Sequence, residues 1–247
     1  MFALGIAVYG VAKILTYATW SGILYCVAGL WLAGMVRPPM AALVAVSLAA
    51  AVVTRRSRAE LRELAPIVKG FLIVVVVVAA AVLVGRSDRF LQDAGIDTTG
   101  GLDSTLADVQ SRTGEGGASF NPSIVSSPAR APIAAVTVLF RPFVFEAHNF
   151  QSLLSAIEGT ALLVLCIFRF RWGIAALRSL RRQPFVVFCL VFTVLFIIAF
   201  SSFANFGLLA RERVQLYPLF LVLFSIPPAT LTTSVPLSRP RPEAVGV

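Results

Sequence analysis

One short stretch of the sequence gathers most of the side chains that could do acid–base chemistry. It is LFRPFVFEAHNFQSLLSAIEG, residues 139–159, and it holds Glu146, Glu158 and the only histidine of the chain, His148. A carboxylate can take a proton from an attacking hydroxyl, and an imidazole can take or give one. We therefore predict Glu146, His148 and Glu158 as candidate catalytic residues of a group-transfer reaction.

Arginines provide a second kind of chemistry. One precedes the acidic cluster, and two more lie in NFGLLARERVQLYP, residues 205–218. The planar guanidinium group matches the oxygens of a phosphate or diphosphate with two parallel hydrogen bonds. The predicted phosphate-binding residues are Arg141, Arg211 and Arg213, and the predicted supporting residues are Asn149 and Asn205.

Other kinds of site find little support in the sequence. The three cysteines, Cys26, Cys166 and Cys189, fall in separate apolar runs without CxxC spacing, and a single histidine makes a zinc site improbable. The glycine-rich phosphate loops, GxSxG elbows and HExxH patterns of soluble enzymes are missing. We expect no metal, no disulfide framework and no cofactor.

The composition indicates whether these polar residues lie in a soluble protein or in a membrane protein. Hydrophobic residues make up 58% of the 247 and charged residues 13%, and the mean hydropathy is +0.87. Soluble domains have roughly half and a quarter, respectively. The composition predicts an integral membrane protein, and a polar residue inside a membrane span is costly enough to suggest a function.

Several apolar runs approach the roughly 20 residues that cross a bilayer as a helix. Predicted spans cover residues 39–53, 65–85, 153–168, 184–205 and 214–231. Together with the N-terminal region, they predict an all-α fold, a polytopic transmembrane bundle of about six spans.

The first 36 residues are too long for one simple crossing, because one helix of that length would measure about 54 Å. Two interpretations are open. Either residues 2–18 are partly interfacial and residues 21–36 cross, or TWSG, residues 19–22, is a hairpin that joins two short spans. The abrupt apolar start favours a chain that lacks upstream spans, and no signal peptide is expected.

The basic residues predict the orientation. Residues 54–64 hold four arginines and residues 169–183 hold five, which is typical of cytoplasmic connections. The long connection, residues 86–131, then lies outside and carries six acidic residues. We interpret the net charge of +9 as topology and contact with anionic lipids, and we expect no nucleic-acid partner.

The predicted organisation has four regions. They are N-terminal transmembrane helices, residues 1–85; an extracytoplasmic polar loop, 86–131; an interfacial segment with the C-terminal transmembrane helices, 132–233; and a disordered cytoplasmic tail, 234–247. PIAAVTVLF, residues 132–140, is too short to span, and Pro142 interrupts it, so we expect a re-entrant or interfacial segment there.

Glu158 is the most costly of the polar residues, since it lies about two turns into a predicted span. Its expected partners are Arg211 and Arg213, in a predicted outer turn between the last two spans. Three interpretations are open. The charges form an ion pair that orders the bundle, they bind an anionic group, or they bind it and catalyse its transfer.

Two stretches also carry a resemblance. FRPFVFEAHNFQSLLSAIEG and FSSFANFGLLARERVQLYPLFLVLF resemble the C-terminal portion of a family of bacterial polytopic membrane proteins linked to envelope polysaccharide genes. That family is loosely similar to the O-antigen polymerases and ligases. The resemblance implies that Arg141, Arg211 and Arg213 engage an undecaprenyl-diphosphate-linked glycan at the outer leaflet of the bacterial inner membrane.

Two classes of function follow. The first is a membrane protein of the cell envelope that binds, polymerises or transfers a lipid-linked oligosaccharide, with a carboxylate as base. The alternative is a noncatalytic bundle, a transporter component or an assembly partner, in which the same charges are structural.

Overall fold

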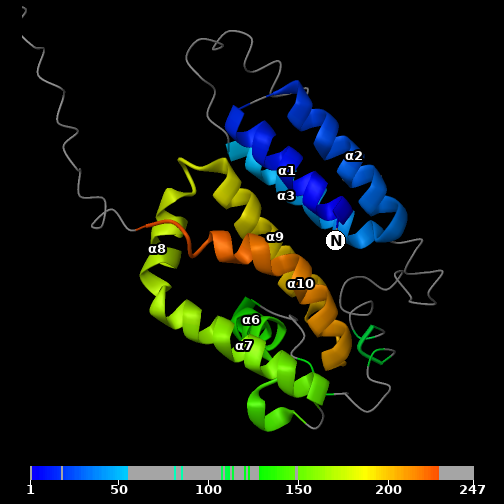
Figure 1. The fold of residues 1–247 in the computed structure, drawn as a ribbon, viewed down its shortest axis with the longest axis vertical. Helices are drawn as coiled ribbons and strands as arrows, with labels where there is room; N and C mark the ends of the chain where they lie inside the picture. The colour runs from blue at the N-terminus through cyan, green and yellow to red at the C-terminus, as the bar shows by residue number, and fades with distance from the viewer. Residues whose placement is uncertain are drawn as a thin grey trace, which may run out of the picture.

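A computed structural model describes residues 2–17, 19–54, 81, 85, 107, 109–111, 113, 120, 122, 128–147 and 150–227, with Gln151 described by its backbone only. This part of the chain is helical and contains no strand, which confirms the all-α prediction. The longer helices are α1 (Phe2–Tyr17), α2 (Trp20–Val36), α3 (Pro38–Thr54), α6 (Ala131–Phe140), α7 (Phe150–Phe168), α8 (Phe170–Ser179), α9 (Pro184–Phe200) and α10 (Phe206–Val222), drawn in Figure 1. Two short 3-10 turns, η2 (Pro128–Arg130) and η3 (Val144–Glu146), flank α6. The predicted tail, most of the predicted loop and nearly all of predicted span 65–85 lie outside the described residues.

The helices α1 and α2 pack against each other as a helical hairpin (Figure 1). Glycines allow the two backbones to touch. A Cβ atom added at Gly10 would lie 2.3 Å from the backbone nitrogen of Cys26, and one at Gly29 would lie 2.3 Å from that of Ala7. Thr19 caps α2 by accepting a hydrogen bond from the backbone N–H of Gly22. Trp20, Ser21 and Gly22 of the predicted turn TWSG belong to the first turn of α2, and which helix crosses a membrane stays a prediction, so both interpretations remain open.

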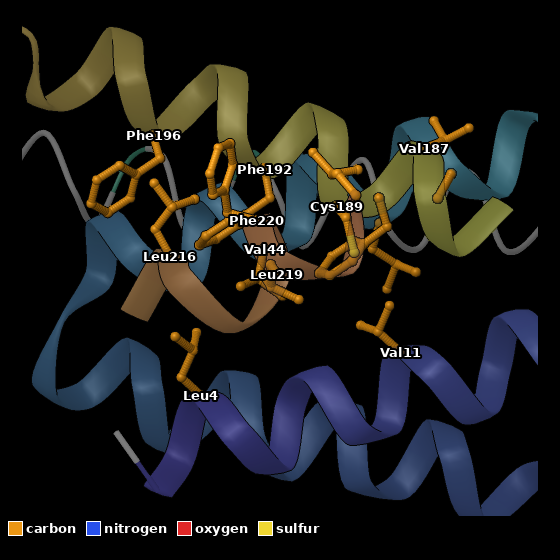
Figure 2. Packing of buried hydrophobic residues seen from close by; sticks show 14 of the residues in the cluster. Leu4, Val11, Val44, Val187, Cys189, Phe192, Phe196, Leu216, Leu219 and Phe220 are labelled. Atoms are coloured by element: carbon orange, nitrogen blue, oxygen red, sulfur yellow. The ribbon is translucent and has the colours of Figure 1, made fainter. Parts of the chain in front are cut away.

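The core lies where α9 packs against α3 and α10, and Figure 2 shows part of its buried side chains. Phe188, Phe192 and Phe196 follow one another at a spacing of four on α9, so they share one face, and all three are fully buried. Val44 of α3 and Leu216 of α10 are also fully buried in this cluster. A helix as apolar as α9 gives no sequence signal for the side that faces inward, and the structure supplies it.

The helices are short for a bilayer. No single described helix combines the length and the apolar character that a crossing needs. The bent pair formed by Ser152–Phe168 and Phe170–Ser179, which meet at 69°, meets the requirement by length and composition alone. The all-helical architecture is thus observed, whereas its relation to a membrane stays a prediction.

The start of the last helix differs from the prediction. The sequence placed a turn over residues 205–218, but α10 begins at Phe206, so Arg211 and Arg213 are helical. Asn205 explains the early start, because its Oδ1 accepts hydrogen bonds from the backbone N–H groups of Gly207 at 2.9 Å and Leu208 at 3.4 Å. These groups have no intrahelical partner at a helix start, and the cap satisfies them.

Candidate functional site

Three of the predicted site residues, Arg141, Glu146 and Arg213, meet at the end of the bundle where α6 ends and α10 begins. Arg141 caps the C-terminus of α6, Glu146 ends η3, and Arg213 lies in the second turn of α10. Glu158 lies on α7, which packs against α6. We call Arg141, Glu146, Glu158, Arg213 and Tyr217 the α6-end cluster. His148 and Asn149 lie outside the described residues.

Arg141 and Glu146 form a two-pronged ion pair. Nε of Arg141 donates to both carboxylate oxygens of Glu146, at 3.0 and 3.1 Å, and Nη2 donates to Oε1. The backbone N–H of Phe143 donates to Oε2 at 2.9 Å. Partial burial raises the pKa of Glu146, but the hydrogen bonds and the charge of Arg141 outweigh it and hold this pKa below its ordinary value. Glu146 therefore stays ionised and is a weak proton acceptor.

Aromatic rings hold the other side of Arg141. Its guanidinium carbon lies 4.9 Å from the centroid of the Phe120 ring and 5.5 Å from that of Phe206, and these rings stack at 4.1 Å with 3° between their planes. The backbone N–H of Phe120 donates to the carbonyl of Ala204 at 2.9 Å, which places Phe120 beside the start of α10. A cation over aromatic faces is attracted by the ring quadrupole. The Arg141 side chain is thus positioned on both sides.

Arg213 is fully buried and donates hydrogen bonds to the end of α6. Its Nη1 donates to the backbone carbonyl of Leu139 at 3.1 Å and to that of Arg141 at 2.7 Å. The last carbonyls of a helix lack intrahelical partners and carry partial negative charge, so a cation there is doubly favourable. Nε and Nη2 of Arg213, however, have no hydrogen-bond partner among the described residues.

Glu158 and Tyr217 are the other two members of the α6-end cluster. The charge of Glu158 acts on both Arg213 and Tyr217, although the Glu158 side chain lies on the exposed side of α7. The hydroxyl of Tyr217 is buried without a partner in the described part of the chain. At the next residue, a Cβ atom on Gly159 would lie 2.4 Å from the carbonyl oxygen of Phe140, so α7 touches the end of α6 at this point.

The predicted pairing of Glu158 with Arg211 or Arg213 is not among the ion pairs of the described residues, which join Arg141 to Glu146 and Arg37 to Glu212. Arg211 is exposed, because residues two apart on a helix point to nearly opposite sides. The structure therefore brings Arg141 and Arg213 together and leaves Arg211 on another face. Asn205 caps α10 and does not extend into the cluster.

One ion pair was not predicted from the sequence. Arg37, between α2 and α3, donates from Nη1 to both carboxylate oxygens of Glu212, and Gln215 donates to Oε2 of Glu212 at 2.7 Å. The Glu212–Gln215 spacing of three was a visible helical signal. The other visible signal was Arg37, a lone arginine between two apolar runs. The pair ties the N-terminal hairpin to α10.

The arrangement can hold an anion but offers no metal centre in the described residues, which contain no group of three His, Cys, Asp or Glu side chains able to share an ion. Comparison of the chain with family models, with curated proteins and with solved structures gave no match. The resemblance to envelope polysaccharide proteins consequently stays a prediction.

Proposed function

We propose that this chain is an integral membrane protein of the bacterial cell envelope that binds the phosphate or diphosphate of a lipid-linked glycan at the α6-end cluster. The proposal has two parts, the membrane and the ligand. Different observations support each part.

Exposed apolar faces support the membrane. On α2, Trp20, Leu24, Val27, Trp31 and Met35 follow at spacings of three and four and form one stripe, with exposures that reach 83% at Trp20. Soluble monomers rarely expose a continuous apolar surface of this kind, and lipid tails would cover it. Helices of 17 residues, such as α2, measure about 26 Å, slightly less than the roughly 30 Å of a hydrocarbon core. A modest mismatch of this size can be accommodated by local bilayer thinning.

The distribution of charge supports the orientation. The connection around α8 has five arginines and no acidic residue, whereas the α6-end cluster has acidic and basic residues together. The helix α7 leads from one end to the other (Figure 1). An arginine-rich end is typical of the cytoplasmic side, so the cluster would lie at the outer leaflet.

The observation that carries phosphate binding is the unsatisfied side of Arg213. A buried guanidinium group whose Nε and Nη2 have no partner among the described residues is costly unless an acceptor completes it. Phosphate oxygens match this edge of the group. Because Arg213 is fully buried, a phosphate reaches these donors by displacing the side chains that cover it.

In a transferase version of the proposal, Glu158 is a better candidate base than Glu146. Glu146 is engaged by Arg141, and its lowered pKa makes it a weak proton acceptor. Glu158 is exposed on α7, takes part in no ion pair of the described residues, and its charge acts on Arg213. A base in that position would take the proton of an acceptor hydroxyl close to the bound phosphate.

A second candidate function is a noncatalytic bundle, such as an assembly partner. The observation that favours it is that most charges at this end of the bundle already join segments of the chain. Arg141 binds Glu146, Arg37 binds Glu212, and Arg213 binds the end of α6. In this case the donors of Arg213 without a partner among the described residues bind no ligand, and their burial is an energetic cost of the structural role.

Native mass spectrometry in nanodiscs that contain an undecaprenyl-diphosphate glycolipid would distinguish glycolipid binding from the noncatalytic bundle. We expect the wild type to retain the glycolipid and Arg213→Lys to lose it, because lysine keeps the charge but lacks the fork. Arg211→Lys, on an exposed face, is the matched control and should retain it. Equal retention by wild type and Arg213→Lys, or retention by neither, would overturn the proposed ligand.

A further inference from the structure

The helix α8 has three distinct faces. Ala176 is buried, and Gly173 lies against Phe224, whose ring would be 3.1 Å from an added Cβ atom, so this face packs on the bundle. A second face is apolar and exposed, and it consists of Phe170, Ile174 and Leu177, which are 57%, 40% and 53% exposed. Arg171 and Arg178, seven residues apart, share a third face next to it.

Five exposed arginines surround this helix: Arg169, Arg171, Arg178, Arg181 and Arg182. The sequence has no aspartate or glutamate between Glu158 and Glu212, and the ion pairs of the described residues do not include these arginines. The guanidinium carbon of Arg169 lies 4.2 Å from the centroid of the Trp172 ring. This end of the bundle therefore presents concentrated positive charge beside an apolar face.

The bend between α7 and α8 gives the two helices different directions. The two helices meet at 69°, and α7 alone has 19 residues, or about 28 Å, which is close to the thickness of a hydrocarbon core. Because α8 turns 69° away from the axis of α7, it would add little to the depth that the pair reaches in a bilayer. The arginines of α8 would also be costly in the hydrocarbon region.

We propose that α8 is an interfacial helix that binds the headgroup phosphates of anionic phospholipids on the side of the membrane opposite the α6-end cluster. The inference rests on the membrane part of the proposed function and not on its ligand. Phe170, Ile174 and Leu177 enter the boundary of the acyl chains, and Arg171 and Arg178 lie among the headgroups.

The apolar face selects a lipid surface over other anionic partners. It continues into the exposed Ile167 and Phe168 at the end of α7, at 62% and 82% exposure. A nucleic acid would contact the arginines but leave this apolar surface in water. An anionic bilayer satisfies both faces at once, since its headgroups and acyl chains lie side by side.

Fluorescence of a single tryptophan tests the proposal. The chain has three tryptophans, so Trp20→Phe/Trp31→Phe leaves Trp172, on α8 itself. The protein is reconstituted in equal mixtures of phosphatidylglycerol and phosphatidylcholine, with bromine on the acyl chains of one or the other. We expect brominated phosphatidylglycerol to quench about twofold more strongly. Arg171→Gln/Arg178→Gln should bring the two to equality, and Arg171→Lys/Arg178→Lys should keep most of the difference.

The outcomes separate this proposal from the membrane proposal. Equal quenching by both lipids in the wild-type background would overturn the anionic-lipid site, and the arginines would then suit an acidic protein partner. Absence of quenching by either lipid, in protein that floats with the vesicles, would place α8 away from the interface and overturn the inference. Failure of the chain to float with vesicles at all would instead overturn the membrane part of the proposed function.

Discussion

Nη1 of Arg213 lies 2.7 Å from the backbone carbonyl oxygen of Arg141, so two arginines predicted to share a phosphate contact each other as side-chain donor and backbone acceptor. The bond places the cation of α10 at the C-terminus of α6. The Arg141 side chain binds Glu146, and two donor nitrogens of Arg213 have no partner in the described part of the chain. The cluster thus combines a structural anchor with an unsatisfied binding edge.

Arg213→Met should destabilise the fold strongly. It removes two hydrogen bonds and leaves the carbonyls of Leu139 and Arg141 unsatisfied in the core, a cost of about 2 kcal/mol or more. Arg211→Met is the matched control, and a change within about 0.5 kcal/mol is expected at that exposed position. Thermal unfolding in detergent would compare them. Equal midpoints for the two variants would contradict an anchoring role of Arg213.

Gly10→Ala should disrupt the N-terminal hairpin. The added methyl group would lie 2.3 Å from the backbone nitrogen of Cys26, so α1 and α2 must separate, at a cost of about 1–3 kcal/mol. Gly5→Ala is the control on the same helix, where an added Cβ meets nothing within 4 Å. That substitution should be neutral or slightly stabilising because glycine is a poor helix residue. The prediction fails if both variants show the same unfolding midpoint.

Acidification should weaken the attachment of η3 through Glu146. Its pKa is lower in the folded chain than in the unfolded chain, so the unfolded state binds protons more readily as the pH falls. The stabilisation is present above the ordinary value of 4.5 and is lost as the pH falls through the lower folded pKa. Comparing the unfolding free energy of the wild type and Glu146→Gln across this range measures the effect. A constant difference at all pH values would show that Glu146 does not contribute through its charge.

Cysteine labelling tests the proposed orientation. Phe145, in η3, and Gln183, between α8 and α9, are exposed and lie before and after the α7–α8 pair. In a background without the native cysteines, Phe145→Cys should react with an impermeant thiol reagent in intact cells, and Gln183→Cys should react only after lysis. The opposite pattern would put the arginines of α8 outside and the α6-end cluster inside.

Local sequence determined the helices themselves. Apolar runs and flanking prolines predicted α9 from Pro184 and placed α3 within one residue at each end, at Pro38–Thr54. These features depend on residues close together in the chain. The early start of α10 was within reach as well, since Asn205 is a favourable cap.

Tertiary packing alone decided which charges meet. Arg37 pairs with Glu212, 175 residues away, and Arg213 faces the end of α6 whereas Arg211 faces outward. In a helix that is apolar nearly all round, like α9, the sequence does not indicate which side faces the neighbouring helices. The rotation and register of the helices follow from tertiary contacts. At one such contact, Gly159 of α7 lies against the backbone of Phe140 at the end of α6, and this contact sets how closely the two helices approach. The types of side chain were therefore visible in the sequence, and their partners were determined by how the helices pack.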